Sequence, residues 1–351
     1  MSTQQVKAFG TEAADLDLQP MKIPRRSVTP NDVEIEILYC GVCHSDLHTA
    51  RSDWDGTIYP VVPGHEIVGK VTRIGDQVTK YKVGDTVAVG CMVDSCRSCE
   101  CCKDDLEQYC DDMVLTYNGH DKHLNMHTFG GYSEKVVVDE HFVLKVPENL
   151  DLAAVAPVLC AGITTWSPLR HWKVGADSKI AVVGLGGLGH MAIKLAKGLG
   201  ANVTLLSRST GKISDAKALG CDAVIISTDE QQMKSVRGKF EVIIDTVPYV
   251  HDLNPYIATL HHSGTLVLVG YLGPLEPILQ TAPMVTKRKA ISGSLIGGIA
   301  ETQELLDFCG EKGIVSDIEI IKIQDINKAY ERMLKSDVKY RFVIDMASLK
   351  G

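Results

Sequence analysis

The stretch Lys179-Ile-Ala-Val-Val-Gly184-Leu-Gly186-Gly187-Leu-Gly189-His190 decides the fold of the second half of the chain. Its apolar run is typical of a buried strand, and the glycine turn leads into a helical pattern. G-x-G-x-x-G in this context is typical of a dinucleotide site, with the pyrophosphate at the helix N-terminus. We expect Gly184 to permit the tight turn, Gly186 to let the backbone approach the pyrophosphate, and Gly189 to let helix and strand pack closely. Gly187 and Leu188 complete the turn.

The runs that follow this turn repeat the alternation of strand and helix. Strands are predicted over residues 202–206, 223–226, 241–245, 265–270 and 291–296, with helical patterns between most of them. This order predicts an α/β domain with a doubly wound parallel sheet. Before about residue 157 the sequence pattern is different. Short predicted strands separated by Gly-Asp turns indicate a smaller β-rich domain there. A length of 351 residues also favours two domains.

The end of the second strand of the parallel sheet bears on the choice of dinucleotide. An Asp or Glu at this place usually accepts a hydrogen bond from the ribose 2′-hydroxyl of NAD. Here the chain reads Ser207-Arg208-Ser209-Thr210-Gly211-Lys212, which has hydroxyls and two cations but no acid. Arg208 suits a bidentate contact with a 2′-phosphate. The segment therefore favours NADP(H), with Ser207, Arg208, Ser209 and Lys212 as contacts. The alternative is an ordinary polar turn.

Three stretches that lie far apart in the chain offer ligands for one metal ion. Cys43, His65 and Cys160 supply two thiolates and an imidazole, a set that leaves the fourth zinc position open for water or substrate. Ser45 and His48 follow Cys43 in the same turn and would place a proton path beside the metal. Taken singly, Ser45 is equally typical of a helix cap and His48 of a solvated surface residue.

A cysteine-rich segment interrupts the β-rich half. Cys96, Cys99, Cys102 and Cys110 are separated by two, two and seven residues. Four thiolates on one short lobe can close a tetrahedron around zinc, which would make this site structural, although an iron–sulfur cluster fits the spacing as well. Cys101 is left over, and we expect it to point away.

Composition excludes several classes of protein. The formal net charge is −8 and no basic cluster stands out, so no nucleic-acid partner is expected. The first residues carry no signal pattern and no apolar run could cross a bilayer, so we expect a cytoplasmic protein without a membrane partner. The 11 cysteines favour metal binding over a disulfide framework.

Together these motifs resemble the zinc-dependent medium-chain alcohol dehydrogenases, most closely their cinnamyl alcohol dehydrogenase branch. The resemblance covers nearly the whole chain in the right order. Its segments are Cys40-Gly-Val-Cys-His-Ser-Asp-Leu-His48, Tyr59-Pro-Val-Val-Pro-Gly-His-Glu66, Leu159-Cys-Ala-Gly-Ile163, Gly184-Leu-Gly-Gly-Leu-Gly-His190, Gly293-Ser-Leu-Ile-Gly297 and Lys339-Tyr-Arg-Phe-Val-Ile-Asp345.

The resemblance implies a Rossmann domain over residues 156–296 and a discontinuous GroES-like catalytic domain over residues 1–155 and 297–351, with the active site in the cleft between them. It implies a catalytic zinc on Cys43, His65 and Cys160 and a structural zinc on the four cysteines of the lobe. Asp46 would fix the tautomer of His65, and Glu66 would lie near the zinc and ligate it transiently. A homodimer is implied, paired through the edge strand at residues 291–296.

The resemblance also implies the remaining contacts. Thr246 would meet the cofactor, and Arg341 would meet its pyrophosphate or else pair with a local acid. The substrate pocket would be lined by Trp54, Leu115, Leu295 and Ile296, which suits aromatic or medium-chain aldehydes. These four residues are equally explained as core. Leu115 stands where plant members typically carry Trp, which argues against a cinnamyl preference.

The main hypothesis is thus a zinc enzyme that transfers hydride between NADP(H) and an aldehyde or primary alcohol, chiefly as an aldehyde reductase. A second hypothesis is a related reductase of conjugated C=C or iminium bonds, against which the intact Ser45 and His48 argue. A third hypothesis is a non-catalytic zinc protein that binds dinucleotide, which would bind NADPH without turnover.

Overall fold

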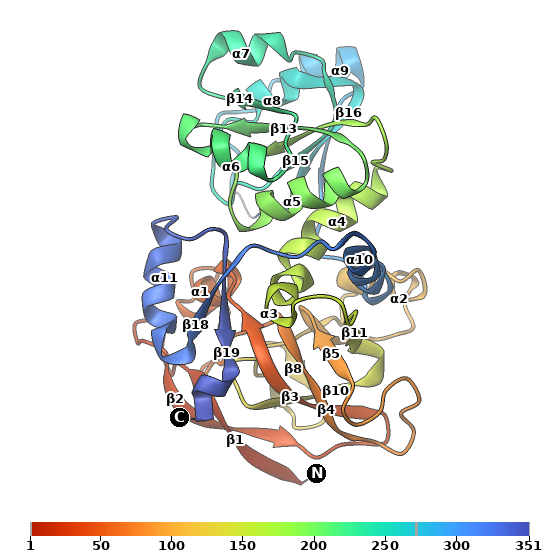
Figure 1. Ribbon diagram of the computed structural model, residues 1–351, viewed down its shortest axis with the longest axis vertical. Coiled ribbons are helices and arrows are strands. Elements are labelled where there is room, and N and C mark those ends of the chain that lie inside the picture. Colours follow the sequence, from red (N-terminus) through yellow and green to blue (C-terminus); the bar gives the residue numbers. More distant parts are fainter. Residues whose placement is uncertain (1, 271–272, 351) are drawn as a thin grey trace. The chain divides into compact units, whose positions relative to one another are not determined.

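The computed structural model describes residues 2–270 and 273–350, and the chain forms two compact units (Figure 1). The first unit comprises Met1–Cys160 and Gly297–Gly351, and the second comprises Ala161–Ile296. The division follows Cys160 rather than residue 155, because the 3₁₀ helix Ala156–Leu159 contacts strands of the first unit. Cys160 therefore lies in the same unit as the other expected ligands of the catalytic zinc.

The second unit is built on one parallel sheet with strand order β14-β13-β12-β15-β16-β17. This order confirms the doubly wound sheet expected from the sequence, since the chain reverses direction across the sheet between β12 and β15. The strands are β12 (Lys179–Val183), β13 (Asn202–Ser207), β14 (Ala223–Ile226), β15 (Phe240–Asp245), β16 (Leu260–Leu268) and β17 (Ala290–Gly293). The helices are α4 (Ala161–His171), α5 (Gly187–Gly198), α6 (Ile213–Ala218), α7 (Glu230–Ser235), α8 (Asn254–Thr259) and α9 (Ala282–Lys287).

The central strand β12 is apolar and buried from Ile180 to Val183, after the exposed Lys179. Ile180, Ala181 and Val182 of β12 are all buried, as a strand covered by helices on both faces requires. The last strand, β17, ends at Gly293, so Leu295 and Ile296 lie beyond it and the expected edge strand is shorter than residues 291–296. Ile296 has a φ of 33°, a value that β-branched residues rarely adopt and that does not continue a strand.

The first unit is β-rich, as the sequence predicts. Its main sheet has the order β11-β5-β4-β3-β19-β18, with β10 also paired to β3. The strands of this unit are β1 (Thr3–Gly10), β2 (Gln19–Arg26), β3 (Asp32–Gly41), β4 (Ile67–Ile74), β5 (Thr86–Val89), β6 (Met92–Asp94), β7 (Val114–Leu115), β8 (His120–Asp121), β9 (Met126–His127), β10 (Lys135–Asp139), β11 (Leu144–Lys145), β18 (Ile318–Lys322) and β19 (Arg341–Asp345). The helices are α1 (His44–Ala50), α2 (Glu100–Lys103), α3 (Leu152–Val155), α10 (Ile299–Lys312) and α11 (Ile326–Leu334).

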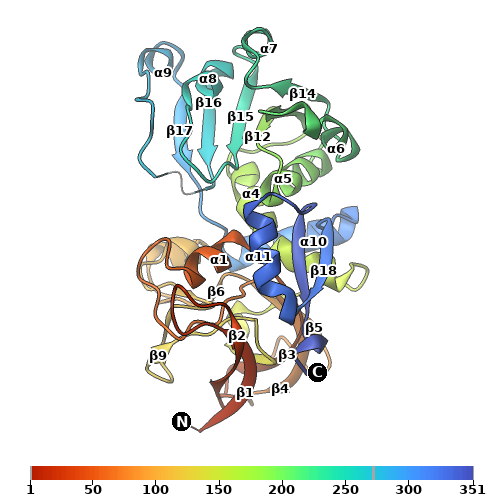
Figure 2. The same ribbon diagram turned by 90° about the vertical axis from the view of Figure 1, so that its left-hand side faces the viewer.

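The C-terminal segment completes the sheet of this first unit. β19 pairs antiparallel with the end of β3, with Val343 opposite Gly41, and β18 pairs parallel with β19 (Figure 2). Phe342 and Ile344 are buried there, so the last part of the chain supplies core to the fold begun by the first part. Within the described residues no single helix is long and apolar enough to cross a membrane. Only the bent pair Leu152–Leu159 and Ala161–His171 meets the length and composition criteria together.

Candidate active site

Four buried side chains from distant parts of the chain converge in the first unit. Cys43, His65, Glu66 and Cys160 each place one ligand atom within 4.8 Å of all the others, and the two sulfurs are 3.9 Å apart. The pKa of the Cys43 thiol lies well below its ordinary value. The largest cause is a hydrogen bond from the Cys160 thiol, and the nearby His65 adds to it. Both outweigh burial, which acts to raise the pKa. Thiolate, imidazole and carboxylate are the donors that zinc takes in proteins, so the set fits this ion.

Strand β3 delivers Cys43 to this cluster. The strand ends at Gly41, where an added Cβ would lie 1.9 Å from Glu66 Oε2, so only glycine permits the approach of that carboxylate. Cys43 then N-caps α1 with extended backbone, and its N–H donates to Asp46 Oδ2 at 2.8 Å. The turn that carries Cys43 is thus a strand-to-helix junction that holds the thiol at the start of the helix.

Asp46 fixes the orientation of His65. It is fully buried, and its Oδ1 lies 3.2 Å from Nδ1 of His65, which leaves Nε2 facing the sulfurs. The same carboxylate accepts hydrogen bonds from the N–H of Gly64 and the hydroxyl of Tyr132. Burial opposes the imidazolium, but Asp46 outweighs it and raises the pKa of His65 well above its ordinary value. Sequence reasoning did not find Tyr132, because nothing in its local pattern marks it.

Replacing Asp46 by Ala is expected to weaken zinc binding at this cluster by about 10- to 100-fold, because the imidazole loses the partner that sets its tautomer and orientation. Competition with a chelator of known affinity measures the change. Tyr132→Phe is the matched control, since it removes one hydrogen bond to Asp46 and leaves His65 in place. Unchanged zinc affinity in Asp46→Ala would contradict this role.

Glu66 and Arg341 form a buried pair at the same place. Arg341 contacts Glu66 Oε1 and donates a hydrogen bond to the carbonyl of Val42 at 2.9 Å. Glu66 Oε2 is buried and has no hydrogen-bond partner, and burial raises the pKa of this carboxyl to about 7 despite Arg341. An orphaned carboxylate oxygen beside two thiols is explained by a cation at this point. Arg341 therefore pairs with a local acid, one of its two expected roles, and its contact with the pyrophosphate stays a prediction.

The two residues of the expected proton path lie on α1. Ser45 Oγ is 3.7 Å from Cys43 Sγ, so the hydroxyl borders the cluster. His48 Nδ1 is 2.8 Å from Asp53 Oδ2, its side chain is 25% exposed, and its ring lies 4.8 Å from that of Trp54. Ser45 is inside the helix while Cys43 is the cap, so the helix-cap explanation of Ser45 does not apply.

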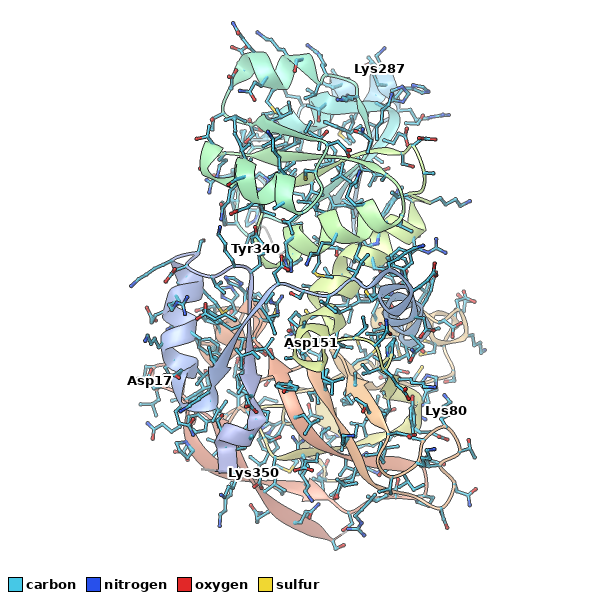
Figure 3. All side chains as sticks on the ribbon, viewed as in Figure 1. Asp17, Lys80, Asp151, Lys287, Tyr340 and Lys350 are labelled. Atoms are coloured by element: carbon cyan, nitrogen blue, oxygen red, sulfur yellow. The ribbon has the colours of Figure 1, made fainter. Side chains whose placement is uncertain are left out.

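Two short helical segments precede Cys160 and position it in the cluster. Asp151, labelled in Figure 3, accepts hydrogen bonds from Ala153 and Ala154 and caps α3, which leads to the 3₁₀ helix before Cys160. Cys91 is a further thiol beside the cluster: its Sγ lies 3.7 Å from the Leu159 carbonyl oxygen, and its proximity contributes to the raised pKa of Cys160 and of His65. Cys91 was missed from the sequence, because it ends no motif and its only signal is its place near the cysteine-rich segment.

The glycine turn after β12 has the geometry expected for a pyrophosphate site. Gly184 has a φ of 88°, and an added Cβ at Gly189 would lie 2.2 Å from the Gly184 carbonyl oxygen. An added Cβ at Gly186 would meet no atom within 4 Å, so the missing side chain leaves open space where a ligand can approach. Gly187 and Leu188 are the first two residues of α5. The Thr246 hydroxyl donates a hydrogen bond to the Val183 carbonyl at 2.7 Å, just before the glycine turn.

The end of β13 carries the polar segment expected to select the dinucleotide. Ser207 is buried, and its hydroxyl donates to the carbonyl of Ser209 at 3.0 Å. Arg208 is exposed, contacts the hydroxyl of Tyr249, and lies 5.2 Å from the centroid of its ring. Lys212 closes the 3₁₀ helix Thr210–Lys212. The guanidinium is thus held by a tyrosine that the sequence did not single out.

Comparison with known proteins places these features in one family. The chain matches the families described as "Alcohol dehydrogenase GroES-like domain" over residues 29–148 and "Zinc-binding dehydrogenase" over residues 187–311. It is 54% identical over 346 residues to aldehyde reductase YahK of Escherichia coli (strain K12), covering 98% of this chain and 99% of that protein. The chain is a zinc-dependent medium-chain alcohol dehydrogenase.

Two further relatives agree with this membership. NADP-dependent alcohol dehydrogenase C 1 of Mycolicibacterium smegmatis is 52% identical over 100% of both chains. A solved structure of a cinnamyl alcohol dehydrogenase from Sorghum bicolor matches with a TM-score of 0.95 at 45% identity, covering 98% of both chains. The resemblance inferred from the motifs, the fold class and the assignment as an enzyme are confirmed.

The cysteine lobe of this alcohol dehydrogenase forms a second set of metal donors. Ligand atoms of Cys96, Cys99, Cys102 and Cys110 lie within 4.8 Å of one another. Backbone N–H groups of Ser98 and Cys99 donate to Cys96 Sγ and lower its pKa to about 6. Among the described residues this set consists of four cysteines, which fits a closed, structural zinc site, and Cys101 lies outside it as expected.

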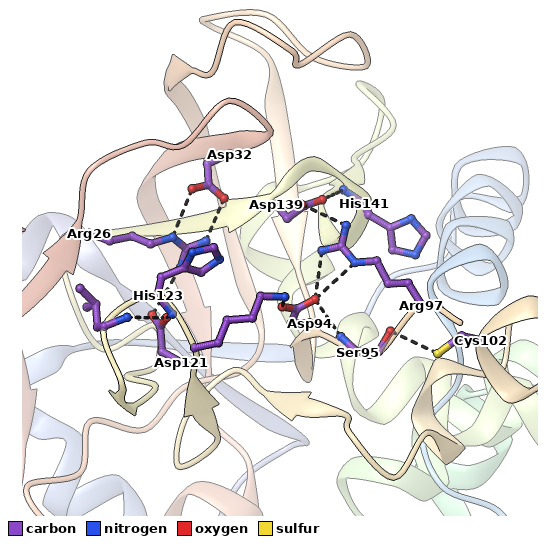
Figure 4. Close-up of polar contacts among 12 residues, drawn as sticks. Arg26, Asp32, Asp94, Ser95, Arg97, Cys102, Asp121, His123, Asp139 and His141 are labelled. Carbon is purple, nitrogen blue, oxygen red and sulfur yellow. Dashed lines mark hydrogen bonds and ion pairs between the residues drawn. The ribbon is translucent and has the colours of Figure 1, made fainter. Parts of the chain in front are cut away.

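Ion pairs attach this lobe to the sheet of the first unit. Figure 4 shows Arg97, next to Cys96, bridging Asp94 of β6 and Asp139 of β10 at 3.0 Å each. Ser95 Oγ lies 3.3 Å from Cys102 Sγ in the same view. These contacts hold the lobe against β6 and β10.

Replacing Cys102 by Ala is expected to remove one zinc ion per chain and to lower the melting temperature by about 10 °C, because a structural zinc contributes folding free energy directly. Calorimetry and metal analysis measure both effects. Cys101→Ala is the matched control in the same lobe and should retain both zinc ions. A Cys102→Ala protein with full zinc content and an unchanged melting temperature would show that the lobe holds no metal.

The expected substrate-pocket residues divide between the two units. Trp54 and Leu115 belong to the first unit and are 46% and 41% exposed, so they are not core residues. Leu295 and Ile296 end the second unit, and Ile296 is buried. Trp54 borders the active site through its ring contact with His48. For all four residues the contact with substrate stays a prediction.

Proposed function

We propose that this alcohol dehydrogenase transfers hydride between NADP(H) and aldehydes or primary alcohols, chiefly as an aldehyde reductase. The observation that carries the proposal is the convergence of Cys43, His65 and Cys160, three donors that leave a fourth position for the substrate oxygen. The relatives named aldehyde reductase and NADP-dependent alcohol dehydrogenase, at 54% and 52% identity over essentially the whole chain, support the same reaction class.

The proposed catalytic zinc would be held by Cys43, His65 and Cys160, with Glu66 as an additional oxygen donor beside it. Bound there, zinc supplies Lewis-acid polarisation of the substrate oxygen. Asp46 holds the His65 ring, and Arg341 offsets the negative charge of Glu66. These residues keep a strongly charged cluster in place inside an apolar unit, where each charge acts at short range.

Ser45 and His48 would move the proton that the reduction of an aldehyde requires. The Ser45 hydroxyl borders the metal donors, and the partly exposed His48 ring can exchange a proton with solvent. Asp53 accepts from the Nδ1 side of this ring, which leaves Nε2 as the exchanging atom. This path supports carbonyl reduction over the reduction of a C=C or iminium bond, which does not deliver a proton to oxygen.

Replacing His48 by Ala is expected to lower kcat/KM for aldehydes by about 100-fold, because solvent can replace an exposed proton carrier only in part. Steady-state kinetics across pH measures this, with zinc content unchanged from the unaltered protein. Trp54→Phe is the control for the neighbouring ring contact. Removal of a metal ligand should lower kcat/KM more than His48→Ala does. Equal losses of kcat/KM in the two variants would contradict the proposed role of His48.

NADP(H) is the proposed cofactor because the end of β13 has no carboxylate to repel a 2′-phosphate. Arg208 is exposed there, and Ser207, Ser209 and Lys212 supply hydroxyls and a second cation. The glycine turn at Gly184–Gly189 offers the N-terminus of α5 to the pyrophosphate. The name of the Mycolicibacterium smegmatis relative supports the same choice.

The direct test of the proposed function is a panel of aromatic and medium-chain aldehydes followed by NADPH and NADH absorbance in parallel. The proposal predicts oxidation of NADPH with several aldehydes and much weaker use of NADH. Binding of NADPH without turnover of any aldehyde, in protein with two zinc ions per chain, would instead favour the non-catalytic zinc protein.

Three finer assignments are part of the proposal. A preference for aromatic or medium-chain substrates is supported by the exposed Trp54 beside His48. A homodimer is supported by the end position of β17 in its sheet, which leaves one strand edge free for pairing. A cytoplasmic location is supported by the 11 cysteines, none of which forms a disulfide in the described residues.

A further inference from the structure

A cavity in the second unit lies at the end of the sheet opposite the glycine turn. It has a volume of 520 Å³ and is formed by the region after α7, the end of α8, the start of β16, and α9. Leu260 is the first residue of β16, and Lys289 immediately precedes β17, so the cavity borders the amino ends of these strands. The pyrophosphate site lies at the carboxyl end of β12, so the two sites are separate.

Cationic side chains dominate this cavity. Arg237, Lys287 and Lys289 line it together with His261 and His262, and none of the described lining residues is an Asp or Glu. Lys287, labelled in Figure 3, ends α9. Such a concentration of positive charge is unusual in a chain whose net charge is −8.

These cations lack carboxylate partners in the part of the chain that the structure describes. Arg237 and Lys287 are exposed and form no ion pair there. Lys289 Nζ donates to the carbonyls of Ile257 and Ala258 at 2.6 and 3.4 Å, which orients the ammonium without neutralising it. Burial, and then the charges of Arg237 and Lys287, lower the pKa of Lys289, as expected for cations that repel one another.

Apart from Gly238 and Thr286, the rest of the lining is apolar. Leu260, Ala258 and Pro283 border the same cavity, and Leu260 is buried. A cavity of this size with cations on an apolar floor suits a small organic body that carries a compact, doubly charged anion. A phosphate group matches both the guanidinium fork of Arg237 and the ammonium groups of the lysines.

We propose that this cavity, lined by Arg237, Lys287 and Lys289, binds a phosphate monoester of a small organic molecule. The site is independent of the proposed reaction, because it shares no residue with the metal cluster or the glycine turn.

The test is isothermal titration of the full-length protein with phenyl phosphate, at low ionic strength and with saturating NADP⁺ so that the nucleotide site is filled. We expect one site per chain. Arg237→Ala and Lys287→Ala should each weaken binding by about tenfold, because each removes a charge-assisted hydrogen bond. Both side chains are exposed, so the fold should not change.

Lys217→Ala is the matched control, because Lys217 is an exposed lysine of α6 in the same unit and does not line the cavity. Its affinity for phenyl phosphate should equal that of the unaltered protein. Inorganic phosphate should bind at least about tenfold more weakly than phenyl phosphate, because the apolar floor then contributes nothing. The proposal is overturned by absence of binding up to about 10 mM, by equal weakening in all three variants, or by equal affinity for phosphate and its phenyl ester.

Discussion

Replacing Cys43 by Ala is expected to abolish aldehyde reduction, with a loss in kcat/KM of at least about 10⁴-fold. The substitution removes one of three proposed zinc ligands, and Lewis-acid polarisation contributes several kcal/mol to such reactions, at about 1.36 kcal/mol per tenfold. The remaining thiol, imidazole and carboxylate sit in a cluster shaped around Cys43, whose N–H is itself bonded to Asp46. Metal analysis should show one zinc ion per chain, held by the cysteine lobe.

Cys221→Ala is the control for this experiment, because Cys221 is a buried thiol of the second unit outside both donor sets. It should retain two zinc ions and nearly full activity. NADPH affinity should be the same in Cys43→Ala and the unaltered protein, since the glycine turn and the β13 segment are untouched. A Cys43→Ala protein that keeps two zinc ions and turns over aldehydes would remove Cys43 from the catalytic site.

Replacing Ser207 by Asp is expected to lower kcat/KM with NADPH by about 10³-fold while NADH is used better than before. Ser207 ends β13, where a carboxylate would accept from a ribose 2′-hydroxyl and repel a 2′-phosphate. Like charges brought together in a binding site cost several kcal/mol, at about 1.4 kcal/mol per tenfold. Parallel kinetics with the two cofactors and one good aldehyde measure the switch.

Ser207→Asn is the matched control, because the amide has nearly the shape of the carboxylate without its charge. It should lower the use of NADPH far less than Ser207→Asp. If both variants lose NADPH equally, the loss comes from the broken contact between the Ser207 hydroxyl and the Ser209 carbonyl, and not from charge. An unaltered protein that prefers NADH would contradict the cofactor assignment itself.

Local patterns were sufficient to predict most of the fold. Ala223–Ile226 is a strand with the bounds expected from its apolar run, because Asp222 precedes it and the polar residues Ser227 and Thr228 follow it. The doubly wound sheet followed from the glycine turn and the repeated strand and helix pattern. Periodicity and turn chemistry are local properties, so a sequence displays them directly.

The features that sequence reasoning missed are those set by distant contacts. The division between the units follows Cys160, because the preceding 3₁₀ helix packs on strands from the other end of the chain. The hydrogen bond that the Tyr132 hydroxyl donates to Asp46 joins residues far apart in sequence, and the acid that pairs with Arg341 could be identified as Glu66 only in the folded chain. Tyr249 reaches Arg208 from another loop. No periodicity marks such partners, since only the folded chain brings them together.

The convergence of three donors on one zinc ion is the central claim, and anomalous diffraction at the zinc edge from crystals of the full-length protein tests it most directly. We predict two anomalous peaks per chain. One should lie among the four cysteines of the lobe, and the other should lie about 2.0–2.3 Å from Cys43 Sγ, His65 Nε2 and Cys160 Sγ. A map of zinc-replete protein with a single peak, in the lobe, would contradict the account.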